Sequence, residues 1–148
     1  MHDLLILLKG EKNMNEHYIA INTFQHDIDC FCPDDYHAFS ITLQKGDLIE
    51  VTPERKFTMA KGWYTFVVIN EQHAFYMAME DLEQYILNEN IKSMLDIDLK
   101  INYLQYKIDQ DLESGDKASF ARHTNLLSET RKLKEELENY FNDITLLN

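Results

Sequence analysis

The sequence predicts an α+β protein, with a small β-barrel in the first half of the chain and an antiparallel α-helical hairpin in the second. Short apolar runs separated by turn residues occupy residues 14–87, which is typical of a closed barrel or small sandwich. The apolar period then changes to three or four residues, as in a helix. Only a Gly-Asp break interrupts this later pattern, and so short a connection favours two antiparallel helices.

The first thirteen residues are expected to lie outside the barrel. Residues 4–8 form an apolar run without a preceding basic residue, shorter than the roughly 7–15 residues of a signal-peptide core. Residues 9–13 can be encoded by a purine-rich stretch similar to a bacterial ribosome-binding site. We therefore expect translation to begin at Met14 and residues 1–13 to be untranslated or disordered, the alternative being an ordinary first strand or helix.

Several segments of residues 14–87 have strand character, because apolar, β-branched and aromatic residues alternate with polar ones or form short runs. Gly46 allows a turn before the segment of residues 48–51, and Pro53 is expected to end that segment. Residues 70–72 are expected to join the last two segments as a hairpin. The predicted strands are residues 18–24, 39–43, 48–51, 63–69 and 74–77.

Two of these segments resemble the Src-homology-3-like (SH3-like) barrels. Residues 39–51 are similar to the stretch that enters the second strand of that family, and Gly62-Trp63-Tyr64 stands where its tryptophan pair begins. The resemblance covers residues 18–86 and implies an aromatic-lined peptide groove with Trp63 and Phe24 as walls. Asn22 replaces an expected tyrosine, and the usual Pro and Tyr after the last hairpin are absent. Alternatively, both aromatics pack inside the barrel.

Helical patterns follow the strands. A short helix is expected from Met79 to about Asn88, with acidic residues in its first turn. A long helix then ends at Gly115, and Asp116 is a ready N-cap for the next. The first long helix has an apolar seam at Met94, Ile97, Ile101, Leu104, Ile108 and Leu112. The second has a stripe at Phe120, Leu126, Leu127, Leu133, Leu137, Tyr140, Phe141 and Ile144.

The hairpin of residues 88–148 is expected to need a further partner. Its stripes, which include Tyr103 and Tyr106, are wider than two helices can cover between them. The barrel, a second copy or another protein could cover them, and we favour a homodimer over the barrel; a wholly intramolecular core is the alternative. The residues expected to bind the partner are Phe120, Leu133, Leu137 and Tyr140, in addition to Trp63 and Phe24.

Residues 108–120 resemble the bacterial IDEAL motif, which is named after an Ile-Asp-Glu-Ala-Leu stretch and occurs in small uncharacterised proteins. Gln110 and Asp111 depart from its third and fourth letters. The resemblance implies a bacterial protein with a regulatory or scaffolding role.

One polar cluster could bind metal. His26, Cys30, Cys32 and His37 could supply four zinc ligands, but a C-x-C pair fits the usual spacing of structural zinc sites poorly. A solvated loop between two strands is the preferred interpretation. No metal or cofactor is therefore expected.

Composition narrows the functional classes. A net charge of −12 repels nucleic acid and anionic membranes, and the cysteine content fits a reducing cytoplasm. No motif of nucleophilic, P-loop, dinucleotide or zinc-protease chemistry occurs. The sequence therefore predicts a non-enzymatic protein-interaction or adaptor module whose protein partner is unknown. An acidic nucleic-acid mimic that inhibits another protein, and a small metal-binding protein, are the alternatives.

Overall fold

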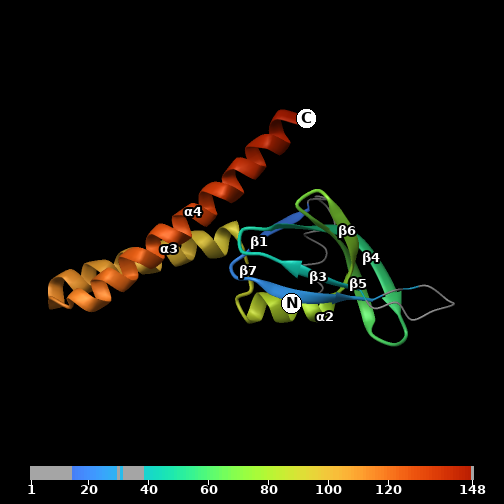
Figure 1. Ribbon diagram of the computed structural model, residues 1–148, viewed down its shortest axis with the longest axis horizontal. Helices are drawn as coiled ribbons and strands as arrows, with labels where there is room; N and C mark the ends of the chain where they lie inside the picture. Colours follow the sequence, from blue (N-terminus) through green and yellow to red (C-terminus); the bar gives the residue numbers. More distant parts are fainter. Residues whose placement is uncertain (1–14, 30, 32–38, 148) are drawn as a thin grey trace, which may run out of the picture. The chain divides into compact units, whose positions relative to one another are not determined.

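The computed structural model describes residues 15–29, 31 and 39–147 (Figure 1). A strand-rich region with two sheets precedes two long helices, which confirms the predicted α+β order. The chain divides into two compact units, Met1–Ile91 and Lys92–Asn148. The predicted extension, residues 1–13, and Met14 lie outside the described residues.

The strand-rich unit is built from antiparallel pairs. Its larger sheet has the strand order β6-β5-β4-β1-β7, and β2 pairs with β3 in a second sheet. The strands are β1 (Glu16–Ala20), β2 (Phe24–Ile28), β3 (Phe39–Leu43), β4 (Leu48–Thr58), β5 (Gly62–Ile69), β6 (His73–Ala78) and β7 (Ile91–Ser93).

The predicted single strand over residues 18–24 is wrong, because the chain bends after Ala20 and starts β2 at Phe24. The amide of Ala20 still donates to the carbonyl of Asp47 at 2.9 Å, but the next amide, of Ile21, donates to Asn90 at 2.8 Å. The chain therefore leaves β4 at this point. As a consequence, residues 24–28 form a strand rather than part of a loop.

Pro53 does not close its strand as expected. β4 continues to Thr58, with a bulge between Val51 and Arg55, where a step of four residues along β4 matches two along β5. A proline has no amide to donate to a ladder, and a bulge tolerates this loss. The bulge lets β4 and β5 continue as a hairpin beyond the core.

The core of the strand-rich unit lies on one face of the larger sheet. Val51 pairs with Val67, and Ile49 with Ile69, so these four side chains share that face. Helix α2 (Met79–Leu87) adds the buried Leu82, as its predicted helical period requires. The cluster consists of Leu43, Ile49, Val51, Val67, Ile69, Phe75, Met77, Leu82 and Ile91.

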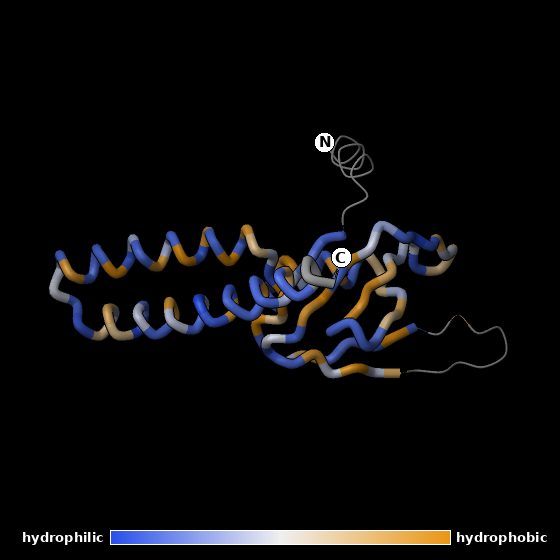
Figure 2. The backbone as a smooth tube through the Cα atoms, turned by 90° about the horizontal axis from the view of Figure 1, so that it is seen from above, coloured by the Kyte–Doolittle hydropathy of each residue, from blue (hydrophilic) through white to orange (hydrophobic). Residues whose placement is uncertain are grey.

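The second unit contains α3 (Met94–Ser114) and α4 (Lys117–Leu147), which lie side by side with hydrophobic positions recurring along both (Figure 2). Gly115 ends α3 in the left-handed conformation with φ 72°, which a glycine adopts without steric cost. The side chain of Asp116 accepts from the amide of Ser119 at 3.1 Å. The predicted glycine stop and aspartate cap are both confirmed.

The predicted seam of α3 is correct except at its end. Ile97, Ile101 and Leu104 are buried, but Leu112 is exposed and Asp111 is buried in its place. At 100° per residue, Asp111 and Leu112 lie about equally far from the middle of the seam, on opposite sides, and only Asp111 contacts His123 of α4. A polar residue therefore occupies the last seam position.

Candidate functional site

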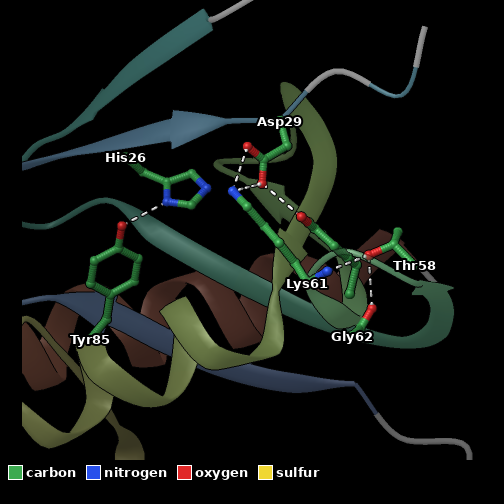
Figure 3. A network of polar contacts seen from close by, with 7 residues as sticks. His26, Asp29, Thr58, Lys61, Gly62 and Tyr85 are labelled. Atoms are coloured by element: carbon green, nitrogen blue, oxygen red, sulfur yellow. Dashed lines mark hydrogen bonds and ion pairs between the residues drawn. The ribbon is translucent and has the colours of Figure 1, made fainter. Parts of the chain in front are cut away.

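His26, a candidate metal ligand that was expected in a solvated loop, lies in β2 and is only 2% exposed. Its Nδ1 lies 2.7 Å from the hydroxyl oxygen of Tyr85 (Figure 3). The His26 ring also stacks on Phe75, with centroids 5.5 Å apart. Burial lowers the pKa of His26, although Asp81 and other carboxylates oppose this shift. The other candidate ligands, Cys30, Cys32 and His37, lie outside the described residues.

Asp29 is the centre of the polar network drawn in Figure 3. It accepts from the hydroxyl of Tyr64 at 2.8 Å, and Lys61 Nζ lies 3.1 Å from the same carboxylate oxygen. Burial alone would raise the pKa of Asp29, but the bonds from Tyr64 and Lys61 outweigh it and hold the pKa below its usual range. The interaction fixes the start of the segment after β2 against the β4–β5 hairpin.

The protonation states of this network suit a structural role. Burial and the nearby Asp29 raise the pKa of Tyr64, and burial together with Asp81 raises that of Tyr85 to about 12. Both phenols therefore stay protonated near neutral pH, and Tyr64 donates to Asp29. General acid–base catalysis is most efficient when the pKa of the catalytic group lies near the operating pH. The pKa values of Asp29, Tyr64 and Tyr85 are all shifted away from neutral pH. Among the described residues, no group of three or more His, Cys, Asp or Glu side chains could hold a metal ion.

The predicted partner-binding residues have different surroundings. Trp63 is exposed and packs edge-on against Phe57, whereas Phe24 is half-buried against Tyr85. In the helical unit, Phe120 and Tyr140 are half-buried, and Leu133 and Leu137 are buried.

The most extensive exposed apolar surface of the helical unit lies on α3. Its side chains are each 56–67% exposed, and at 100° per residue they fall within an arc of about 80°. This arc lies opposite the buried seam of Ile97, Ile101 and Leu104. We call the surface the outward face of α3; it consists of Leu95, Leu99, Tyr103 and Tyr106. Leu112 is also exposed but lies about 100° outside this arc.

The outward face is apolar along most of its length. Gln110, which lies within the arc, donates to the hydroxyl of Tyr106 at 2.8 Å. Lys107 borders the face with its Nζ 5.7 Å from the ring centroid of Tyr103. The polar groups are therefore at the edges, and the middle of the face is formed by leucine and tyrosine side chains.

Sequence reasoning found part of this face and missed the rest. Tyr103 and Tyr106 were expected to need a covering surface, whereas Leu95 and Leu99 were not noticed. The signal was present in the sequence, because Leu95, Leu99, Tyr103 and Tyr106 follow one another at steps of four, four and three. α3 thus has two apolar stripes on opposite sides.

Asp111 and His123 form a second unpredicted feature, near the turn between the helices. Oδ2 of Asp111 lies 2.6 Å from Nδ1 of His123, and their side chains are 10% and 15% exposed. The backbone carbonyl of Asp111 also accepts from the amide of Asp116 at 3.1 Å. This pair closes the hairpin at the position where the apolar seam ends.

Fold and surface define the class: an α+β protein with a strand-rich unit and a helical unit, the latter with an uncovered apolar helix face. No helix of the described ranges is long and apolar enough to cross a membrane. Comparison of the chain with protein-family models, with curated proteins and with solved structures found no match. The SH3-like and IDEAL resemblances therefore stay predictions.

Proposed function

We propose that this chain is a non-enzymatic protein-interaction module that associates with a second copy of itself through the outward face of α3. The observation that supports the proposal is the apolar face itself, with four large side chains each more than half exposed. The largest exposed apolar patch of a protein often marks an interaction site.

The area of the face suits a modest protein interface. The exposed parts of the four side chains amount to about two and a half whole side chains, or ~500 Å² if each contributes ~200 Å². This value is within the roughly 300–600 Å² found for the largest patch of typical monomers, a patch that is often functional. A standard interface buries about 800 Å² from each partner, so the rim of the face would supply the remainder.

The order of residues along the face favours a second copy of the chain. Leu95 and Tyr106 are at its two ends, and Leu99 and Tyr103 lie between them. In an antiparallel pair of α3 helices, Leu95 meets the partner's Tyr106, and Leu99 meets the partner's Tyr103. A twofold interface requires this kind of self-complementarity.

For the strand-rich unit, we propose an SH3-like barrel. The antiparallel order β6-β5-β4-β1 and the contacts between β2 and β6 support it, since a barrel needs the second sheet to approach the edge of the first. Amide-to-amide NOEs that extend from β2 to β6 in solution would support closure. A β6 edge whose amides exchange as fast as those of a free edge would contradict it.

Light scattering coupled to size exclusion tests the association. The wild-type chain should elute with twice the mass of one chain at high concentration. Leu99→Asp and Tyr103→Asp each place a charge in the middle of the face and should weaken the dimer by at least about tenfold. Asn125→Asp, on an exposed part of α4, is the matched control and should remain dimeric.

Two results would contradict the proposal. One is a monomeric mass for the wild-type chain over the whole accessible concentration range. The other is a dimer that both variants leave intact although circular dichroism shows that they are folded, because the interface would then lie elsewhere.

A further inference from the structure

A second surface lies at the tip of the β4–β5 hairpin, beyond the Pro53 bulge. Phe57 and Trp63 stand directly opposite each other on the two strands, with ring centroids 5.2 Å apart. Both are more than half exposed, and Met59 in the turn is 94% exposed. We call Phe57, Met59 and Trp63 the hairpin tip; it exposes about two side chains' worth of apolar surface, on the order of 400 Å².

Arg55 lies on the same face as the tip. It pairs with Thr65 two residues before Phe57 pairs with Trp63, and alternate residues of a strand share a face. Its Nη1 donates to the carbonyl of Thr52 at 2.6 Å and also to Thr65 Oγ1. All hydrogen bonds that Arg55 makes to described residues come from Nη1. The guanidinium is therefore held through Nη1, and its Nε and Nη2 donors make no hydrogen bond to described residues.

The hairpin that forms the tip contains most of the described basic residues of the strand-rich unit. The described basic residues of the strand-rich unit are Lys45, Arg55, Lys56 and Lys61, and the last three belong to this hairpin. The acid of the hairpin, Glu54, hydrogen-bonds Tyr76 on the other face of the strands, and Asp29 from the end of β2 pairs with Lys61. The face that presents Phe57 and Trp63 thus has an arginine and no carboxylate of its own hairpin.

From these contacts we propose that the hairpin tip binds a short acidic peptide segment of a partner protein. The Nε and Nη2 donors of Arg55 bind a carboxylate through two parallel hydrogen bonds, the bidentate geometry that guanidinium groups favour. Phe57, Met59 and Trp63 cover an apolar side chain next to that carboxylate. The exposed area is too small for a folded partner, which needs about 800 Å² on each side, but it suits a peptide.

Trp63 is the one tryptophan of the chain, so its fluorescence reports directly on the tip. The probe is the capped peptide Glu-Phe-Glu-Leu-Glu, titrated against the full chain; the same peptide with Gln for each Glu is the comparison. The acidic peptide should shift the emission of Trp63 to shorter wavelength in a saturable way. The Gln peptide should bind at least about tenfold more weakly, because it lacks the charge-assisted bonds.

Variants separate the proposed contacts. Arg55→Gln should weaken binding of the acidic peptide about tenfold and remove the difference between the two peptides. Met59→Ser leaves Arg55 and its anchors in place and should weaken both peptides. Arg131→Gln on α4 is the matched control and should bind as the wild type does, provided that thermal unfolding shows all three variants to be folded.

Three outcomes of the peptide titrations would overturn the proposal. These are no saturable change up to ~1 mM peptide, equal affinity for the acidic and Gln peptides, and unchanged binding by folded Arg55→Gln. A fluorescence shift with phosphatidylglycerol vesicles but not with the peptide would also overturn it, since the tip would then be a membrane contact.

Discussion

His26 shows how burial sets the chemistry of a single residue. Its ring lies between Phe75 and Tyr85 in the interior of the strand-rich unit, where a charged imidazolium is poorly solvated. Its pKa is therefore lowered, and the residue is a neutral member of the core. A histidine in this state contributes to stability only while it is uncharged.

The stability of the strand-rich unit should fall as the pH falls through the range near and below 6.5. The folded pKa of His26 is below its unfolded value, so the unfolded chain binds the proton first and unfolding becomes easier in acid. The midpoint of urea unfolding, followed by Trp63 fluorescence at pH 7.5 and pH 5, should decrease for the wild type.

The decrease should be smaller in His26→Gln, which has no proton to bind there. His73→Gln, at an exposed position of β6, tests whether replacing any histidine has the same effect. Equal pH dependence in wild type and His26→Gln would show that His26 is not the group responsible. The pKa of His17 is also lowered by burial, so some pH dependence should remain.

At the scale of elements, the helical hairpin combines an apolar seam with one largely buried polar pair. Ile97, Ile101 and Leu104 form the seam of α3, and Asp111 with His123 continues it toward the turn. Removing one partner of a buried pair leaves the other without compensation, whereas removing both can be nearly neutral. The pair is therefore expected to behave as a unit.

Replacing one member of this pair should cost much more than replacing both. His123→Ala should destabilise the helical unit by about 3 kcal/mol, because Asp111 remains buried without its partner. The double replacement Asp111→Leu with His123→Leu should recover most of this loss. Asp109→Ala, at an exposed position nearby, should change stability by less than about 0.5 kcal/mol. Chemical unfolding followed by circular dichroism at 222 nm measures all three. Additive losses in the double variant would show that the two residues do not interact.

At the scale of the whole molecule, the apolar outward face of α3 and the net charge of −12 act in opposite directions. Burial of the outward face favours association, whereas the like charge of two chains opposes their approach. Salt screens the repulsion and leaves the apolar contribution largely unchanged. Association through this face should therefore be stronger at higher ionic strength.

The proposed dimer should make thermal unfolding depend on concentration and on salt. A contact between two chains that forms only when both are folded raises the unfolding midpoint as the protein concentration increases. The midpoint of the helical signal at 222 nm should therefore rise with protein concentration and again with added NaCl, but not in Tyr103→Asp. A midpoint independent of both in the wild type would argue against association.

What could be predicted from the sequence depended on local pattern. The helix boundaries at Met79 and Gly115, and the cap at Asp116, followed from period, glycine and side-chain capping, which involve neighbours within a few residues. The strands from Phe39, Trp63 and Ala74 also had clear local signals. The α+β order of the chain was therefore accessible without coordinates.

Other features depended on contacts between distant residues. The bend after Ala20 follows from hydrogen bonds to Asp47 and Asn90. The continuation of β4 past Pro53 depends on its register with β5. The burial of Asp111 depends on its contact with His123 on the next helix. For the candidate surfaces, the sequence alone identified apolar residues, but only tertiary structure decided which are buried and which are exposed. The physical reason is that local patterns determine which side of an element is apolar, whereas packing determines what covers it.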